Sequence, residues 1–153
     1  MVDYRDEEIS ITVTGHSLGA ALATLSAADI VANKLNRCTG SDKICMVTAF
    51  VFASPKVGDK GFREVFDQLS NLYLLRVKNK MDFVPKLPPK LPFRAYEKVG
   101  IELKVNSCEK VILKVKEELH EGLPVHSLTQ YLVALGSKFH RGWSQIEVSF
   151  TVQ

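Results

Sequence analysis

Apolar and polar positions along the chain follow a strand period in some segments and a helix period in others. Residues 9–14 form a β-rich run, residues 45–53 are nearly continuous in apolar side chains, and residues 71–77 form a third such run. The continuity of residues 45–53 is typical of a strand in a parallel sheet that is covered on both faces. Residues 96–99 and 101–105, on either side of a glycine, predict two short strands that would pair in antiparallel fashion.

Helical spacing of apolar residues predicts three helices between or after these strands. The second helix begins after Asp59, whose carboxylate is a favoured N-cap. The apolar positions are Ala21, Leu25, Ala28, Ala32 and Leu35 in the first helix, Phe62, Val65, Phe66 and Leu69 in the second, and Leu128, Tyr131, Leu132, Leu135 and Phe139 in the third. Strands and helices in alternation predict an α/β fold, with a mostly parallel sheet flanked by helices.

The length and composition of the chain fit one globular domain. Its 153 residues are 46% hydrophobic and 24% charged, which allows a buried core. The sequence contains neither an apolar run of ~18 residues nor a signal-peptide pattern, so no transmembrane segment is expected. The three cysteines, Cys38, Cys45 and Cys108, cannot all pair and lack the spacing of metal ligands. We therefore expect a reducing, cytoplasmic location. The sequence implies no metal and no cofactor.

Positive charge is concentrated in one part of the chain. Between Arg76 and Lys116 the sequence contains eleven Lys or Arg residues and four acidic residues, whereas the whole chain has a formal charge of +3. This basic segment could lie against anionic lipid headgroups at a membrane surface, or it could be an ordinary solvated face. Nucleic acid is not an expected partner, because the basic residues are not interleaved with aromatic residues as in nucleic-acid-binding modules.

The pentapeptide Gly15-His16-Ser17-Leu18-Gly19 connects the first predicted strand to the first predicted helix. In a Gly-x-Ser-x-Gly elbow the serine takes strained backbone angles that lift its hydroxyl above the sheet. The two glycines would leave out side chains that collide where strand and helix converge. A simple tight turn could have the same sequence, but the flanking strand and helix favour a nucleophilic Ser17. The amide of Leu18, at the helix start, would then donate to an oxyanion.

Ser17, Asp82 and His126 follow one another in the chain order of α/β-hydrolase triads. Asp82 lies just beyond the third strand, at the sheet edge where open α/β folds place their active sites. A serine hydroxyl needs an imidazole to take its proton during attack, and an acid to orient that imidazole. We therefore predict Ser17 as nucleophile, His126 as base and Asp82 as acid, although His126 considered alone would be assigned as a structural histidine.

The other three histidines are weaker candidates for the base. His16 lies inside the elbow, where its side chain is expected to point away from the Ser17 hydroxyl. His120 lies among charged residues and His140 is followed by an arginine, so both are expected to be solvated.

Four segments resemble the successive signature blocks of the class 3 (fungal-type) lipases, and most closely the plant phospholipase A1 branch of that family. They are residues 15–23 (GHSLGAALA), 52–58 (FASPKVG), 76–88 (RVKNKMDFVPKLP) and 126–132 (HSLTQYL). The resemblance implies an α/β-hydrolase fold and a serine acyl hydrolase that removes the sn-1 acyl chain of phospholipids or galactolipids. It also implies Ser17 as nucleophile, Asp82 as acid, His126 as base and the Leu18 amide in the oxyanion hole.

In that family several strands, a lid and a second oxyanion donor precede the elbow, whereas sixteen residues precede Ser17 here. The resemblance therefore predicts one partial lipase-like domain over residues 1–153, the half with the elbow and the triad. An exposed sheet edge and the lack of one oxyanion donor are expected to follow. Two functions fit these expectations: an active lipid esterase, or a catalytically silent lipase remnant that binds a partner.

Overall fold

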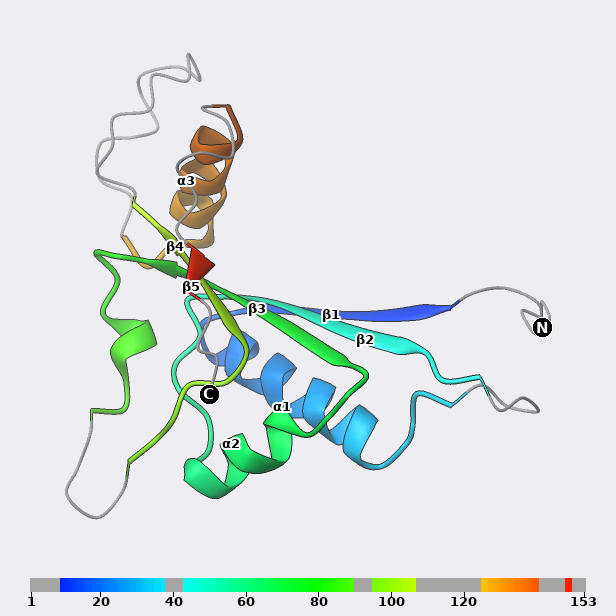
Figure 1. Ribbon diagram of the computed structural model, residues 1–153. Coiled ribbons are helices and arrows are strands. Elements are labelled where there is room, and N and C mark those ends of the chain that lie inside the picture. Colours follow the sequence, from blue (N-terminus) through cyan, green and yellow to red (C-terminus); the bar gives the residue numbers. More distant parts are fainter. Residues whose placement is uncertain (1–8, 38–42, 90–94, 107–124, 141–147, 150–153) are drawn as a thin grey trace.

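The computed structural model of the protein describes residues 9–37, 43–89, 95–106, 125–140 and 148–149. One five-stranded sheet, in the order β1-β2-β3-β4-β5, forms the centre of the molecule (Figure 1). The elements are β1 (Ser10–His16), α1 (Leu18–Ala32), β2 (Met46–Phe52), α2 (Lys60–Asp67), β3 (Leu72–Asn79), the 3₁₀ helix η1 (Val84–Lys86), β4 (Ile101–Val105), α3 (Leu128–His140) and β5 (Val148–Ser149).

Strands β1 to β4 run parallel, and β5 pairs with β4 in antiparallel fashion. The predicted α/β class, with a mostly parallel sheet flanked by helices, is thereby confirmed. The predicted antiparallel pair at residues 96–99 and 101–105 is wrong. Residues 96–99 form no strand, and β4 instead pairs in parallel with β3, where Leu75 is in register with Ile101. A partner so distant in sequence is not visible in the local pattern of apolar residues.

Helices α1 and α2 pack together on one face of the sheet (Figure 1). The core on this side joins Val47, Ala49 and Val51 of β2 to the alanines of α1 and to Phe66 of α2. These three residues of β2 alternate along the strand and therefore point to the same face. The core thus holds α1 against the sheet and fixes the start of the helix, where Ser17 lies.

The opposite face is covered by α3 at the carboxyl ends of the strands, where α3 packs on Val77 and Leu103. On the same face, Phe50 of β2 and Tyr73 near the amino end of β3 are 41% and 55% exposed. The prediction that residues 45–53 are covered on both faces is therefore wrong for the part of the chain that the structure describes.

The buried faces of α1 and α2 differ from the predicted stripes. Five of the six alanines of α1 are buried, whereas Ala32 is exposed, Leu25 and Leu35 are 42% and 64% exposed, and Leu35 lies beyond the helix. Alanine allows close approach of helix and sheet, so the leucines are left on the outside. In α2 the predicted core residue Val65 is 56% exposed. The predicted N-cap is confirmed, because the Asp59 carboxylate accepts a hydrogen bond from the Phe62 amide at 3.0 Å.

Candidate active site

Ser17 lies at the junction between β1 and α1. Its backbone has φ 58° and ψ −124°, a conformation that is strained for a residue with a side chain. The Ser17 amide donates to the carbonyl oxygen of Phe52, at the end of β2, over 3.0 Å. The packing of β1 and α1 on either side of Ser17 holds this strained residue in place, as in a nucleophile elbow.

Gly15 allows the strand and the helix of the elbow to approach each other. A Cβ atom at Gly15 would lie 2.3 Å from the carbonyl oxygen of Gly19, so no side chain fits there. A Cβ atom at Gly19 would meet nothing within 4 Å. The predicted steric role is thus confirmed for Gly15 and wrong for Gly19, whose backbone is the surface that Gly15 approaches.

Asp82 follows β3 in a turn and is 1% exposed. Its Oδ2 accepts hydrogen bonds from the Tyr131 hydroxyl at 2.7 Å and from His126 Nδ1 at 2.8 Å. Its Oδ1 accepts from the Val84 amide at 2.9 Å. Burial raises the pKa of the Asp82 carboxyl, but these hydrogen bonds and the nearby imidazole outweigh burial, so the pKa lies below its usual value. The group is therefore a carboxylate at neutral pH.

His126 lies in the turn before α3, with its side chain 32% exposed. Its Nδ1 is 2.8 Å from Asp82 Oδ2, and its Nε2 is 2.8 Å from Ser17 Oγ. Because a carboxylate only accepts hydrogen bonds, Nδ1 is assigned the proton and the Nε2 lone pair faces the Ser17 hydroxyl. The structure thus brings the three predicted residues into one chain of hydrogen bonds.

Tyr131 of α3 is fully buried and donates its hydroxyl proton to Asp82. Burial and the neighbouring carboxylate raise the pKa of Tyr131 above its usual value, which keeps the hydroxyl a donor. In the sequence Tyr131 is one member of an apolar helical stripe, and nothing in that stripe marks it as a partner of Asp82.

His16, at the end of β1, lies beside His126, the predicted base. The ring centroids of His16 and His126 are 4.9 Å apart, and His16 Nε2 is 2.8 Å from the backbone carbonyl oxygen of His126. His16 is thus engaged with the backbone and not with the Ser17 hydroxyl, as expected of a histidine that is not the base. The contact itself has no counterpart in the sequence pattern.

Leu18 is the first residue of α1, so its amide has no acceptor within the helix. The start of a helix also carries a partial positive charge. The amide next to Ser17 is therefore available to a negative oxygen that forms on the substrate.

Some predicted features fall outside the described residues. His120, Cys38 and Cys108 are among them, while Cys45 is buried and His140 ends α3. The cytoplasmic location stays a prediction.

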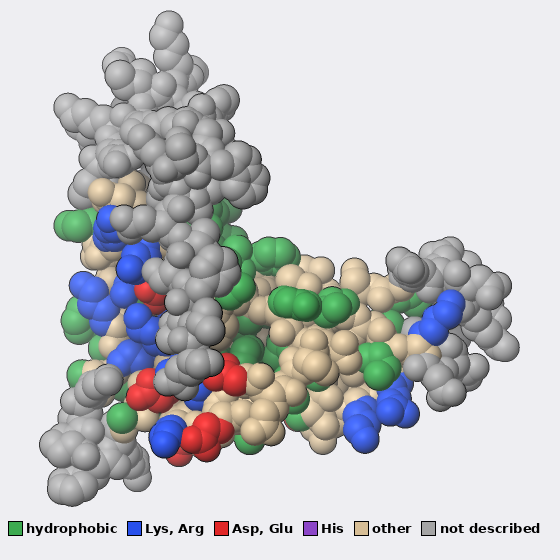
Figure 2. Space-filling model, viewed as in Figure 1, with side chains coloured by type: hydrophobic (Ala, Val, Ile, Leu, Met, Phe, Trp, Pro, Cys, Tyr) green, Lys and Arg blue, Asp and Glu red, His purple; other side chains and the backbone are tan. Residues whose placement is uncertain are grey.

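Part of the basic segment is built around a buried ion pair between β3 and β4. Arg76 Nη2 is 2.6 Å from Glu102 Oε2, and Lys98 Nζ is 3.2 Å from the same oxygen. Arg76 is only 6% exposed. At the left of the molecule in Figure 2, Lys and Arg side chains gather with acidic side chains beside them. The described part of the basic segment is therefore a mixed surface over a buried pair.

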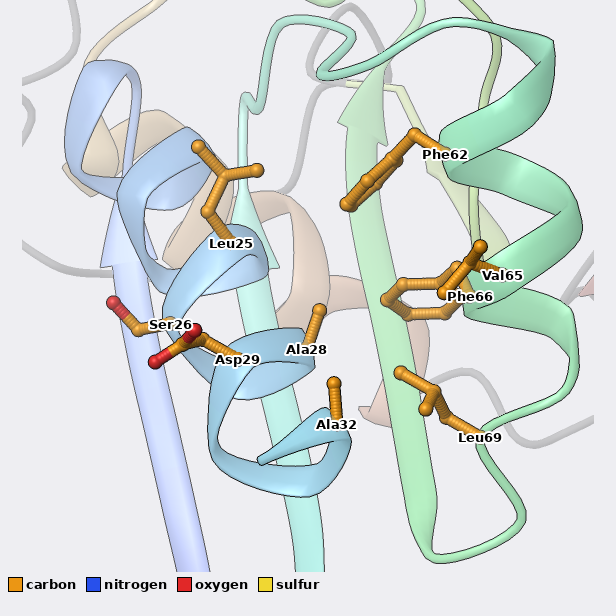
Figure 3. A pocket seen from close by; sticks show the side chains of 9 residues that line it. All are labelled: Leu25, Ser26, Ala28, Asp29, Ala32, Phe62, Val65, Phe66 and Leu69. Atoms are coloured by element: carbon orange, nitrogen blue, oxygen red, sulfur yellow. The ribbon is translucent and has the colours of Figure 1, made fainter. Parts of the chain in front are cut away.

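A groove of about 490 Å³ lies between α1 and α2 (Figure 3). Its lining is mainly apolar and includes Leu25, Phe62 and Leu69. None of the residues of the hydrogen-bonded chain lines this groove, so it is separate from the candidate active site.

A parallel sheet, a strained serine between strand and helix, and a Ser–His–Asp chain of hydrogen bonds are features of the α/β-hydrolase class. Within that class, this chain belongs to the class 3 lipase family, since the family model "Lipase (class 3)" matches residues 1–91.

Curated relatives include plant proteins named phospholipase A1. Phospholipase A1-II 4 of Oryza sativa subsp. japonica is 48% identical over 149 residues, which are 97% of this chain and 35% of that protein. Phospholipase A1-IIgamma of Arabidopsis thaliana is 48% identical over 130 residues, 84% of this chain and 29% of that protein. This chain thus spans about a third of the length of the curated relatives that it matches.

Fungal lipases are among the similar solved structures. Lipase II from Rhizopus niveus aligns with a TM-score of 0.51 and 27% identity, over 62% of this chain and 33% of that chain. The Rhizomucor miehei lipase propeptide complex aligns with a TM-score of 0.50 and 30% identity, over 63% of this chain and 28% of that chain. The likeness in fold to these two structures covers a little under two thirds of this chain.

Proposed function

We propose that this protein hydrolyses acyl esters of lipids, with the sn-1 ester of a phospholipid as its substrate. The observation that carries the proposal is the chain of hydrogen bonds from Ser17 Oγ through His126 to Asp82. Membership of the class 3 lipase family and similarity to proteins named phospholipase A1 support an acyl-lipid substrate. Because the chain spans about a third of those relatives, activity and positional specificity are both proposals for it.

In the first half of the proposed reaction, Ser17 Oγ attacks the ester carbonyl carbon. Its proton passes to His126 Nε2, which lies 2.8 Å away. The Asp82 carboxylate keeps Nδ1 of His126 protonated and stabilises the imidazolium that forms. The oxyanion of the tetrahedral intermediate accepts from the Leu18 amide. The expectation that a second oxyanion donor is missing stays a prediction.

Collapse of the intermediate breaks the ester bond and leaves an acyl group on Ser17. His126 gives its proton to the departing alkoxide of the lysolipid, so no unprotonated leaving group has to escape. A water molecule then attacks the acyl carbon while His126 Nε2 takes one of its protons. Collapse of this second intermediate breaks the bond to Ser17 Oγ, His126 returns the proton to that oxygen, and the free fatty acid leaves. The cycle needs no metal or cofactor at any step.

Exposed apolar side chains next to the proposed triad favour contact with a lipid aggregate. Leu18 follows Ser17 and is 70% exposed, while Met81 and Phe83 flank Asp82 and are 54% and 63% exposed. No helix in the described ranges is long and apolar enough to cross a membrane. Peripheral contact with a membrane surface through these side chains is part of the proposal, with exposed lysines of the basic segment facing anionic headgroups.

Hydrolysis of a short-chain ester and of a phospholipid with two distinguishable acyl chains tests the proposal. The expected products from the phospholipid are the sn-1 fatty acid and a 2-acyl lysophospholipid. Ser17→Ala should lower kcat by on the order of 10⁴-fold or more, because the nucleophile is lost. Ser26→Ala, at an exposed position of α1, is the matched control and should retain activity. Hydrolysis that survives Ser17→Ala would contradict the assignment.

A second candidate function is a catalytically silent module that binds a partner. It is favoured by the edge of the sheet, since in the described ranges β1 pairs with β2 on one side and with no strand on the other. An unpaired strand edge can add a strand from another chain. A purified chain that hydrolyses neither ester and unfolds without two-state cooperativity would favour this alternative.

A further inference from the structure

His16 contacts the residue that would act as the base. Its ring lies 4.9 Å from the His126 ring at a 39° tilt, and 6.1 Å from the Tyr131 ring at 75°. Its Nε2 is 2.8 Å from the backbone carbonyl oxygen of His126. Because a carbonyl oxygen only accepts hydrogen bonds, His16 Nε2 must carry a proton. His16 is therefore a donor to the backbone of the proposed base.

The two neighbouring histidines thus differ in which nitrogen is protonated. A neutral imidazole has one donor and one acceptor nitrogen. His126 has its proton on Nδ1, facing Asp82, and His16 has its proton on Nε2, facing the carbonyl. The Nε2 of His16 is occupied as a donor and cannot accept the Ser17 proton, which separates the roles of the two rings.

The turn that contains His126 is held by side chains from two strands. Asn79, at the end of β3, donates through Nδ2 to the carbonyl oxygen of Val125 at 3.2 Å. His16, at the end of β1, holds the next carbonyl along the chain. Val125 itself is 42% exposed, so packing of its side chain does little to fix the turn. These hydrogen bonds therefore tie the turn to the carboxyl ends of the parallel strands.

We propose that His16 is a positioning residue, which keeps the His126 imidazole within reach of Ser17 by holding the His126 backbone. The inference rests on the proposed function, in which His126 is the base. His16 and Ser17 are consecutive, so the segment that carries the nucleophile also fixes the backbone of the base. A displaced turn would lengthen the 2.8 Å distance between His126 Nε2 and Ser17 Oγ. Misplacement by about 1 Å can cost about a hundredfold in rate.

The variants His16→Gln and His16→Met form a matched pair for the test, made in the full chain. Both side chains are flexible and of similar length, but only glutamine offers an N–H donor. With a short-chain ester, methionine should lower kcat roughly tenfold and leave KM within about twofold, because one hydrogen bond to a backbone carbonyl is lost. Glutamine should recover kcat to within about threefold of the wild type. Thermal unfolding of both variants separates a loss of turnover from a loss of folding.

Equal kcat values for the two variants, whether both high or both low, would overturn the proposal. A second readout uses the wild-type chain alone, by ¹⁵N NMR of the imidazole rings at neutral pH. The expected spectrum has His16 as the Nε2–H form and His126 as the Nδ1–H form. His16 in the Nδ1–H form would overturn the proposal even in an active enzyme. No ester hydrolysis by a chain with the expected forms would contradict the proposed function, and with it the role of His16.

Discussion

At the scale of single residues, the Asp82 carboxylate depends on three donors. They are the Tyr131 hydroxyl, His126 Nδ1 and the Val84 amide. A buried charge is costly unless it is hydrogen-bonded. Here the donors lower the pKa of Asp82 by more than burial raises it. The result is a fixed negative charge beside the imidazole, which would stabilise its cation during attack.

Tyr131→Phe removes one of these donors and keeps the ring. We expect the pKa of Asp82 to rise toward its ordinary value, and the free energy of unfolding to fall by about 1–2 kcal/mol. Because the pKa of Asp82 is lowered in the folded wild type, the carboxylate stabilises the fold at pH values above its ordinary pKa and loses this effect as the pH falls. The difference in free energy of unfolding between wild type and Tyr131→Phe should therefore narrow below about pH 4. Urea unfolding at several pH values measures it. Tyr73→Phe, at a 55% exposed position, should change stability by less than about 0.5 kcal/mol. Equal losses in free energy of unfolding for Tyr131→Phe and Tyr73→Phe would contradict the role of the Tyr131 hydroxyl as a donor to Asp82.

Residue types and chain order are enough to nominate Ser17, Asp82 and His126, because each has a chemistry that few other side chains supply. The supporting contacts of Tyr131 and His16 could not be predicted. Both depend on which way α3 and the end of β1 face in space. In the sequence one residue belongs to an apolar stripe and the other to a glycine-rich turn.

At the scale of elements, α1 shows that apolar spacing predicts the presence of a helix better than it predicts which face of the helix is buried. A helix forms in the predicted segment but ends before Leu35; five of its six alanines are buried, and Leu25 is 42% exposed. The close contact between Gly15 and Gly19 draws the start of the helix toward β1. Small side chains are then the ones that fit between helix and sheet.

Gly15→Ala should separate β1 from α1, because its Cβ would lie 2.3 Å from the Gly19 carbonyl oxygen. We expect a loss of about 3 kcal/mol or more in the free energy of unfolding, as in other overpacked sites. Gly136→Ala in α3 is the matched control. Its Cβ would meet nothing within 4 Å, and alanine favours a helix by up to about 1 kcal/mol. Urea unfolding of both variants measures the difference, and a tolerated Gly15→Ala would contradict this account of the elbow.

At the scale of the whole molecule, the sheet brings distant segments of the chain together. Ser17 and Asp82 follow β1 and β3 and so lie at the same end of the sheet, beyond the carboxyl ends of its parallel strands, as predicted. The placement of β4 and β5 could not be predicted, because strand pairing is set by contacts between segments far apart in sequence. The buried pair of Arg76 and Glu102 joins β3 to β4.

Glu102→Gln leaves the buried Arg76 guanidinium without its counter-charge. We expect the free energy of unfolding at pH 7 to fall by about 3 kcal/mol. Burial raises the pKa of Glu102, but Arg76 and Lys98 lower it below its ordinary value of 4.5. The wild type should therefore lose the stabilisation from the Glu102 carboxylate as the pH falls through the lowered pKa. The free energies of unfolding of the wild type and Glu102→Gln should then converge in acid. Glu64→Gln, in an exposed pair with Lys60, should have little effect. A difference in free energy of unfolding between the wild type and Glu102→Gln that stays constant from pH 7 into acid would contradict this role of the Glu102 carboxylate.

The central claim is that Ser17 is a nucleophile activated by His126. The most direct test is reaction of the full chain with a fluorophosphonate, followed by mass spectrometry to locate the modified residue. We predict one modified serine, Ser17, with no labelling in Ser17→Ala and much slower labelling in His126→Ala. A wild-type chain that unfolds cooperatively yet stays unlabelled, or that is labelled at a different serine, would contradict the account.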